Sequence, residues 1–276
     1  MLKSIQLMFN KSILSLAILT MISVGCSKFR RIEKSEDWRV KYEAGLNYYA
    51  KKDYYRASIL FEQILPIVRG LPEGEKVEFN LAYCQYHEKL FLLASDQFKT
   101  FYETYGRSSL AEEATFMYAY CLYASSPDSS KDQHSSIEAM NAMQNFLNRY
   151  PGSQFLNRAV DVITISQQKL EKKGFDNAKH YLKLKMYEAA VISLDNFKKN
   201  FPDSKYLEES AYLKVVAEFE LASVSIRTKQ LERFNLTVDY YKELVDNFPN
   251  SNFLKEAERY YTESLEQVNK LKSNKI

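Results

Sequence analysis

The chain has 276 residues and a formal net charge of +3, with few glycines and prolines and with 21 tyrosines and 17 phenylalanines. This composition favours helix over sheet. Lys3 and Lys11 lie in a segment that we expect to be removed, so the mature chain is close to neutral. A neutral chain has no electrostatic reason to bind nucleic acid, and its mixed lysines and glutamates are typical of solvated helix faces.

Residues 1–25 have the pattern of a signal peptide. Lys3 and Lys11 precede an apolar run at residues 13–24, which is short for a bilayer span but has the length of a signal-peptide core. The run ends in Ser-Val-Gly-Cys, which resembles the lipobox of bacterial lipoproteins, with Ser23 where that motif usually has leucine. The resemblance implies cleavage before Cys26, diacylglycerol on its sulfur and an acyl chain on its amino group. The alternative is an uncleaved anchor helix with an incidental cysteine.

Residues 26–37 follow the lipobox and are polar and charged. We interpret them as the lipidated cysteine and a flexible tether to the folded part of the chain. The folded part is expected at residues 38–272.

One connector occurs three times, with the pattern aromatic, Pro, any residue, Ser, any residue, aromatic, Leu. Its copies are residues 150–156, 201–207 and 248–254, and a worn copy at residues 105–110 has Gly106 in place of proline. Proline cannot continue the preceding helix, and serine is a favourable N-cap for the next one. Copies of one connector between amphipathic runs indicate a repeated unit.

The small and aromatic positions between the connectors are in phase with the tetratricopeptide pattern. Long polar connections are expected inside the third pair, at residues 125–136, and inside the fifth, at residues 225–233. A helix at residues 256–271 would cap the last repeat, which has no further neighbour. We therefore predict an all-α fold, a right-handed α-solenoid of five tetratricopeptide-like helix pairs plus a C-terminal capping helix. The five pairs should end at about residues 69, 105, 151, 202 and 247.

Cys84 and Cys121 fall at the same place in successive repeats. Neighbouring helix axes lie about 8–10 Å apart, which is beyond the reach of a disulfide, so we expect both to be small buried residues. No Cys/His cluster has the spacing of a metal site, and no catalytic motif is found. The sequence therefore predicts a non-enzymatic protein with no cofactor apart from the acyl chains on Cys26.

The repeat phase also predicts an aromatic strip on the concave surface, which is lined by the first helix of each pair. Aromatic residues at helical spacing are usually core residues, but the small residues, Tyr48 and Leu81 already fill the core positions here. We therefore interpret the strip as a groove for an extended peptide with an aromatic end. Two lysines of the fourth repeat would face the carboxylate of the peptide. The predicted groove residues are Tyr42, Tyr49, Phe79, Tyr83, Tyr86, Phe116, Tyr120, Tyr123, Lys179 and Lys183.

The lipobox, the tether and the repeats with their connectors together resemble the BamD family of outer-membrane protein assembly factors. The run Leu-Ala-Tyr-Cys-Gln-Tyr at residues 81–86 and the enlarged turn at residues 125–136 carry this resemblance too. It implies a periplasm-facing lipoprotein of the outer membrane. It also implies that residues 38–151 recognise unfolded β-barrel precursors, and that residues 152–272 dock to the BamA-like insertase, alongside other subunits of the machinery.

Two alternatives remain open at this stage. One is another envelope tetratricopeptide scaffold, such as a CpoB-like cell-division protein or an adaptor of peptidoglycan enzymes; that type usually has a coiled coil, and no heptad run precedes Trp38. The other is a glycan-binding surface lipoprotein, a class with tryptophan-rich sites, whereas this chain has one tryptophan.

Overall fold

The computed structural model describes residues 28–273, so the apolar run at residues 13–24 and Cys26 lie outside the described residues. Between residues 28 and 273 the regular elements are helices and no strand occurs, which confirms the predicted all-helical fold class. No helix in this range is long and apolar enough to cross a bilayer. The helices are α2 Trp38–Ala50, α3 Tyr54–Val68, α4 Pro72–His87, α5 Phe91–Thr104, α6 Ala111–Ser125, α7 His134–Arg149, α8 Leu156–Lys183, α9 Tyr187–Asn200, α10 Leu207–Val224, α11 Arg227–Asn247 and α12 Leu254–Ser273.

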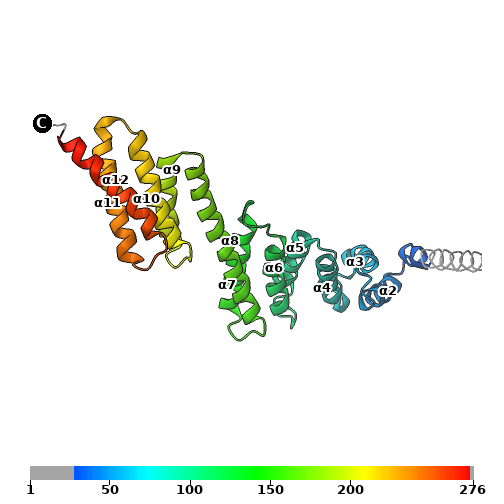
Figure 1. The fold of residues 1–276 in the computed structure, drawn as a ribbon. Coiled ribbons are helices and arrows are strands. Elements are labelled where there is room, and N and C mark those ends of the chain that lie inside the picture. Colours follow the sequence, from blue (N-terminus) through cyan, green and yellow to red (C-terminus); the bar gives the residue numbers. More distant parts are fainter. Residues whose placement is uncertain (1–27, 274–276) are drawn as a thin grey trace, which may run out of the picture. The chain divides into compact units, whose positions relative to one another are not determined.

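The chain forms two compact units. Unit 1 comprises the described residues up to 126 together with residues 134–164, and unit 2 comprises residues 127–133 and the described residues from 165 onward. Helices α2 to α7 of unit 1 and α9 to α12 of unit 2 each pack on the next helix, as in a tetratricopeptide-like solenoid (Figure 1). The boundary falls inside α8, so this helix contributes to both units.

Unit 1 has an aromatic core. Phe98, Phe101, Phe116 and Phe146 are fully buried between α4, α5, α6 and α7. A second cluster joins α2, α3 and α4, where Gly45 permits close approach, because a Cβ atom there would lie 2.7 Å from Cε1 of Phe61. Gly45, one of the small residues that set the repeat phase, is therefore small because the ring of Phe61 packs directly against it.

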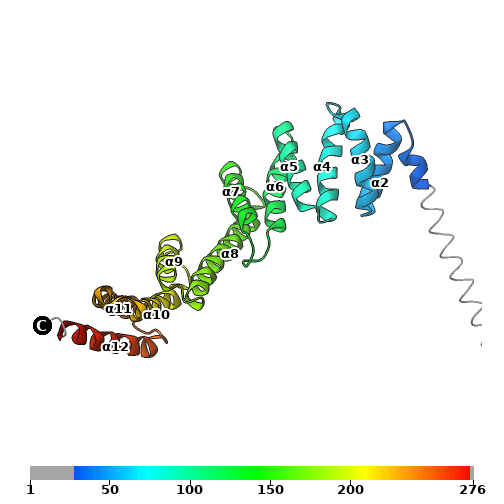
Figure 2. The ribbon, with the colours of Figure 1, turned by 90° about the horizontal axis from the view of Figure 1, so that it is seen from above.

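Unit 2 ends in the predicted capping helix. Figures 1 and 2 show α12 alongside α10 and α11, and it contacts both. It buries Ala257, Tyr260 and Val268 against them. The expected cap at residues 256–271 is thus present.

The connectors do more than stop one helix and begin the next. Their second aromatic ring stacks in parallel on a ring of the preceding repeat's first helix, with centroid distances of 4.7 Å, 4.8 Å and 4.8 Å. Such offset stacking contributes roughly 0.5–1.5 kcal/mol beyond burial of the ring surface. The stacked pairs are Phe116–Phe155, Phe175–Tyr206 and Tyr212–Phe253.

The connector serines act differently from the prediction. Each accepts a hydrogen bond from the backbone N–H two residues later, as in Ser153 to Phe155 at 3.0 Å, while the helix itself begins one residue further on. Two of these hydroxyls also donate to a glutamate of the preceding repeat, Ser108 to Glu75 and Ser153 to Glu112. The serine therefore caps the short turn before the helix and joins adjacent repeats.

Two expectations about connections are wrong. Residues 28–33, predicted as part of the flexible tether, are helical, and Phe29 is buried against Tyr48 with ring centroids 5.7 Å apart. The long connection expected at residues 225–233 is only Ser225 and Ile226, because α11 begins at Arg227. The first turns of α11 are polar, so their sequence resembles that of a loop. The enlarged turn of the third pair is confirmed, since α6 ends at Ser125 and α7 begins at His134.

Candidate functional site

Four tyrosines of unit 1 form a continuous surface, which we call the tyrosine strip: Tyr83, Tyr86, Tyr120 and Tyr123. They lie at three-residue spacing on α4 and α6, which places each pair on one helix face. The ring centroids are 6.3 Å apart from Tyr83 to Tyr86, 6.2 Å from Tyr86 to Tyr120 and 5.8 Å from Tyr120 to Tyr123. All four side chains are half-buried, so each has one face on the core and another part at the surface.

His87 extends the strip towards the N-terminal repeat. Its ring lies 5.3 Å from that of Tyr86 and stacks on Tyr54 at 4.1 Å. Tyr54 contacts Tyr49 at 5.6 Å, so the predicted residue Tyr49 joins the strip through ring contacts. Tyr54 itself was missed, because it is the first residue of a second helix and the prediction considered only first helices.

Tyr42, also predicted for the groove, is half-buried and contacts Trp38 with ring centroids 6.4 Å apart. Ring contacts of Tyr42 with the tyrosine strip are not found. Tyr42 therefore belongs to the N-terminal edge of unit 1.

Phe79 and Phe116 were predicted to line the groove, and this is wrong. Phe79 is 8% exposed and Phe116 is 0% exposed. Phe79 packs against Phe98 and Phe101, and Phe116 packs against Phe146 and the connector ring of Phe155. The two phenylalanines form the buried layer on which the strip packs, because Tyr83 contacts Phe79 and Tyr120 contacts Phe116.

Two hydroxyls of the strip have raised pKa values, those of Tyr83 and Tyr86. Tyr83 donates a hydrogen bond to Glu113, and burial together with this carboxylate raises the pKa of the Tyr83 hydroxyl far above its ordinary value. Burial also raises the pKa of Tyr86. Burial and the nearby Lys52 lower the pKa of His87. At neutral pH the strip therefore presents uncharged rings with polar edges.

One cation lies over the strip. The guanidinium carbon of Arg158, an exposed residue at the start of α8, is 4.8 Å from the ring centroid of Phe116 and 5.1 Å from that of Tyr120. Both distances are within the range of a cation–π contact. The sequence prediction did not include Arg158. It follows a connector, and only the folded chain brings it over the rings of the preceding repeat.

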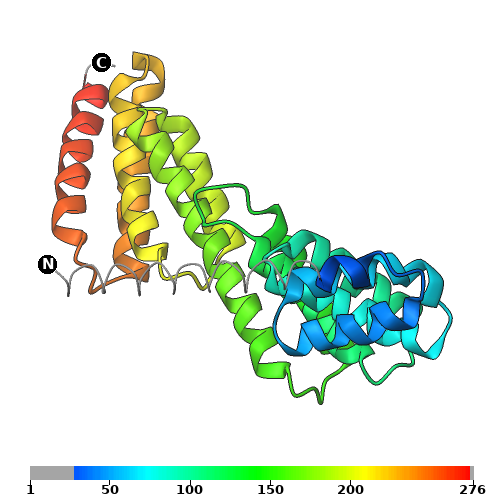
Figure 3. The same ribbon diagram turned by 90° about the vertical axis from the view of Figure 1, so that its right-hand side faces the viewer.

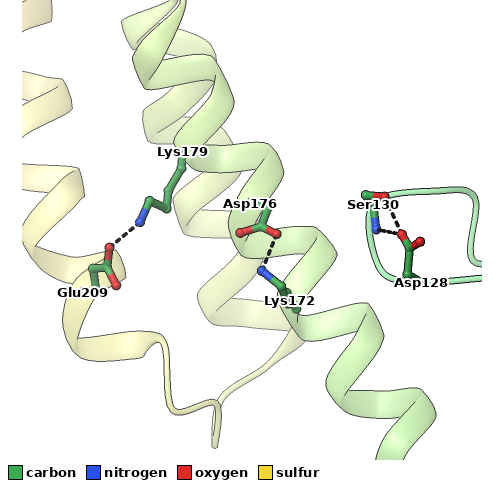
Figure 4. Close-up of polar contacts among 6 residues, drawn as sticks. All are labelled: Asp128, Ser130, Lys172, Asp176, Lys179 and Glu209. Carbon is green, nitrogen blue, oxygen red and sulfur yellow. Dashed lines mark hydrogen bonds and ion pairs between the residues drawn. The ribbon is translucent and has the colours of Figure 1, made fainter.

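The two predicted lysines, Lys179 and Lys183, are in unit 2. Lys179 is in an ion pair with Glu209 at 2.6 Å and lies 5.1 Å from the ring centroid of Phe175, which is itself buried (Figure 4). Figure 4 also shows Lys172 paired with Asp176 on the same helix. Lys183 is exposed at the C-terminal end of α8.

Unit 2 contains a cavity of about 280 Å³ between α9, α10 and α11. Lys214 lies in its wall, 2.6 Å from Asp195 and 3.7 Å from the ring centroid of Tyr240. Lys198 pairs with Glu243 at the same cavity. Burial raises the pKa of Tyr240 to about 12, with nearby carboxylates adding to the effect. The charges of this cavity therefore compensate one another.

The two thiols of the repeats are confirmed as buried and free. Burial raises the pKa of Cys84 to about 12 and that of Cys121 to about 12. Among residues 28–273, no group of three histidine, cysteine or acidic side chains is placed to hold a metal ion.

Comparison with known proteins gives matches along most of the chain. The profile of YfiO, a family described as outer membrane lipoprotein, matches residues 35–210 and 178–270. The outer membrane protein assembly factor BamD of Neisseria meningitidis is 23% identical over 240 residues, which are 82% of this chain and 85% of that protein. BamD of Neisseria gonorrhoeae is 23% identical over 235 residues, covering 81% and 84%.

Comparison with solved structures finds a tetratricopeptide-repeat protein from Bacteroides fragilis. It is 14% identical, has a TM-score of 0.38, and the alignment covers 84% of this chain and 100% of that one. The apo form of RapI is 16% identical with a TM-score of 0.38, covering 90% and 92%.

Proposed function

Because this chain belongs to the outer membrane lipoprotein family YfiO, we propose that it is a non-enzymatic subunit of the machinery that assembles β-barrel proteins in the outer membrane. The support is the family match together with the similarity to two BamD proteins, which covers more than four fifths of this chain and of each relative. Its helical repeats fit a binding role, since repeat proteins offer extended surfaces to partners.

The proposed anchor is Cys26, with diacylglycerol on its sulfur and an acyl chain on its amino group. The basis is the lipobox-like sequence at residues 23–26, which lies outside the described residues. Several acyl chains on one residue anchor a protein stably, because each buried methylene contributes about 0.8 kcal/mol. In this proposal the repeats face the periplasm of a Gram-negative bacterium.

The proposed precursor site is the tyrosine strip of unit 1. The observation that carries this assignment is the continuous series of ring contacts from Tyr49 to Tyr123, in which the tyrosines are half-buried and His87 is exposed. Tyrosine suits a surface that must hold apolar side chains and also hydrogen-bond a peptide backbone. Aromatic side chains of an unfolded barrel strand would lie on these rings, and Arg158 would pair with the terminal carboxylate.

The proposed docking region for a BamA-like insertase is unit 2. Its surface chemistry differs from that of unit 1, with paired charges around the cavity between α9, α10 and α11. An interface that excludes wrong partners commonly uses such arranged charges.

The test is affinity purification of the full chain from detergent-solubilised outer membranes. Recovery of a BamA-like barrel protein supports the proposal. Recovery of peptidoglycan enzymes or cell-division proteins without any barrel protein would contradict it and would favour the scaffold alternative. A photo-crosslinker at Tyr120 should capture barrel precursors, and one at Tyr181, an exposed tyrosine of unit 2, should not.

A further inference from the structure

Two connections between helices of unit 2 carry apolar side chains that are largely exposed. The α8–α9 turn carries Leu184 and Met186, which are 54% and 50% exposed. The α10–α11 turn carries Val224 and Ile226, which are 68% and 67% exposed. The α9–α10 and α11–α12 connectors, which alternate with these turns, differ because their half-buried aromatic rings stack on rings of α8 and α10.

The two turns lie at the same end of unit 2. Figures 1 and 3 both show the end of α8 and the α10–α11 turn at one end of the helices, opposite the α9–α10 and α11–α12 connectors. Contacts between their flanking residues agree with this placement. Arg233 of α11 pairs with Glu188 of α9 at 3.7 Å, and Tyr187 of α9 interacts with Glu220 of α10. The two turns therefore lie at one end of unit 2, and we call their four exposed apolar side chains the turn patch.

Basic residues surround the turn patch. Lys183 and Lys185 flank Leu184, and Arg227 and Lys229 follow Ile226; all four are exposed. Three acids lie in the same segments, Glu188, Glu220 and Glu232, and Glu188 pairs with Arg233, so the four exposed cations outnumber the remaining acids. The patch therefore combines apolar tips with a net positive rim.

We propose that the turn patch inserts its four apolar side chains into the headgroup region of an anionic phospholipid surface. Isolated apolar side chains beside lysine and arginine are characteristic of segments that lie in a membrane interface. Each lysine or arginine close to an anionic surface strengthens the attraction about fivefold. A protein partner fits less well, because lysine is depleted in protein interfaces. This contact is separate from the proposed acyl anchor and from the tyrosine strip.

The test uses the full chain reconstituted in vesicles of phosphatidylethanolamine and phosphatidylglycerol. An environment-sensitive fluorophore is attached to Ile226→Cys or to Leu184→Cys. Cys84 and Cys121 are buried and react slowly, and the unsubstituted chain reports any label on Cys26. The matched control is Leu265→Cys, an exposed leucine in the middle of α12. Labels at 226 and 184 should shift to shorter emission wavelength and be quenched by spin-labelled lipids, whereas the label at 265 should not.

Charge reversal then tests the positive rim. The variant K185E/R227E/K229E changes three exposed residues and should keep its helicity. It should lower the ratio of lipid-embedded to water-exposed label at 226 by at least about a hundredfold, because three attractive charges are replaced by three repulsive ones. Labels that stay in water while the chain floats with the vesicles would overturn the proposal and leave the acyl anchor intact. Labels that become shielded only after a second protein is added would also overturn it, and would assign the patch to a protein partner.

Discussion

Unit 1 and unit 2 share their connector geometry but differ in the chemistry of their surfaces. In both, a connector ring stacks on a first-helix ring, as Phe155 does on Phe116 and Tyr206 on Phe175. In unit 1 the ring of Phe116 also contacts Tyr120, and the exposed Arg158 lies over Tyr120. In unit 2 the ring of Phe175 is contacted by Lys179, which is in an ion pair with Glu209. The same scaffold position therefore presents rings in one unit and paired charges in the other.

The cores of the two units also differ, with more aromatic rings in unit 1 and more charged side chains in unit 2. Unit 1 has two large clusters with five fully buried phenylalanines, whereas unit 2 has three smaller clusters. Between these smaller clusters, unit 2 places partly buried charges such as Lys214 and Arg233, with side chains 14% and 16% exposed. Paired charges specify orientation more than they add stability. This contrast suits a division in which unit 1 binds flexible aromatic segments and unit 2 binds a defined partner.

The largest expected effect is on the shared stacking pair. Phe116→Ala removes a fully buried ring and should lower the free energy of unfolding by about 3–5 kcal/mol. Phe175→Ala is the matched variant in unit 2 and should have a similar effect, since Phe175 also packs on a connector ring and on Phe197. Chemical denaturation followed by circular dichroism measures both. A negligible change for either variant would show that its stacking pair is not part of the core.

The next effect concerns the surface of unit 1 alone. Tyr83→Ala with Tyr120→Ala should weaken binding of an aromatic-ending barrel peptide roughly a hundredfold, because two anchoring rings are lost. Helicity should be retained, because both side chains are only half-buried. Tyr55→Ala with Tyr181→Ala is the control, since these tyrosines are exposed and outside the strip. Fluorescence anisotropy with a labelled peptide measures the affinity, and an unchanged value would remove the strip from the proposed site.

Alkaline pH should distinguish the two units, because the repeats' only thiols, Cys84 and Cys121, are both in unit 1. Folding raises the pKa of each to about 12. Their contribution to stability is therefore fully present below the unfolded value of about 8.5 and is lost as pH rises towards the folded value. Near pH 9.5 the loss should be about 1.4 kcal/mol per thiol.

Thiol alkylation during denaturant titration measures this loss in unit 1. The variant C84A/C121A provides the control, and its unfolding midpoint should fall less steeply between about pH 8.5 and 9.5, because only half-buried tyrosines such as Tyr83 and Tyr240 still contribute. If the unsubstituted chain has the same pH dependence as this variant, the two thiols are not buried as described.

The repeat pattern of the sequence was sufficient to predict the helices, the cap and the buried thiols. The spacing of small residues and connectors is local, and it determines which residues face the neighbouring helix. Phe79 and Phe116 were placed wrongly because their burial depends on rings from other elements, Phe101 of α5 and Phe155 of a connector. Such partners cannot be read from the spacing within one helix.

Two further errors have the same origin. The first turns of α11 are polar, yet Phe234 packs with Ala222 and Val268, and these distant contacts hold the region in a helix. Phe29 lies in a charged segment, and its contact with Tyr48 holds residues 28–33 as a helix against the first repeat. Arg158 was missed because it comes from α8, after the connector that follows the strip's own helices. Four of the predicted tyrosines do lie together, because their spacing on α4 and α6 is a property of each helix.

The smallest expected effect shows whether Arg158 or Lys179 binds the carboxylate of the peptide. Arg158→Gln should weaken binding of a peptide with a free C-terminal carboxylate about tenfold, because a charge-assisted hydrogen bond is lost. The same peptide with an amidated C-terminus should bind both forms equally. Lys179→Gln should have no effect on either peptide, since Lys179 is already paired with Glu209 in unit 2. If the lysine variant alone were sensitive to amidation, the carboxylate would be bound through Lys179, and Arg158 would have no part in its recognition.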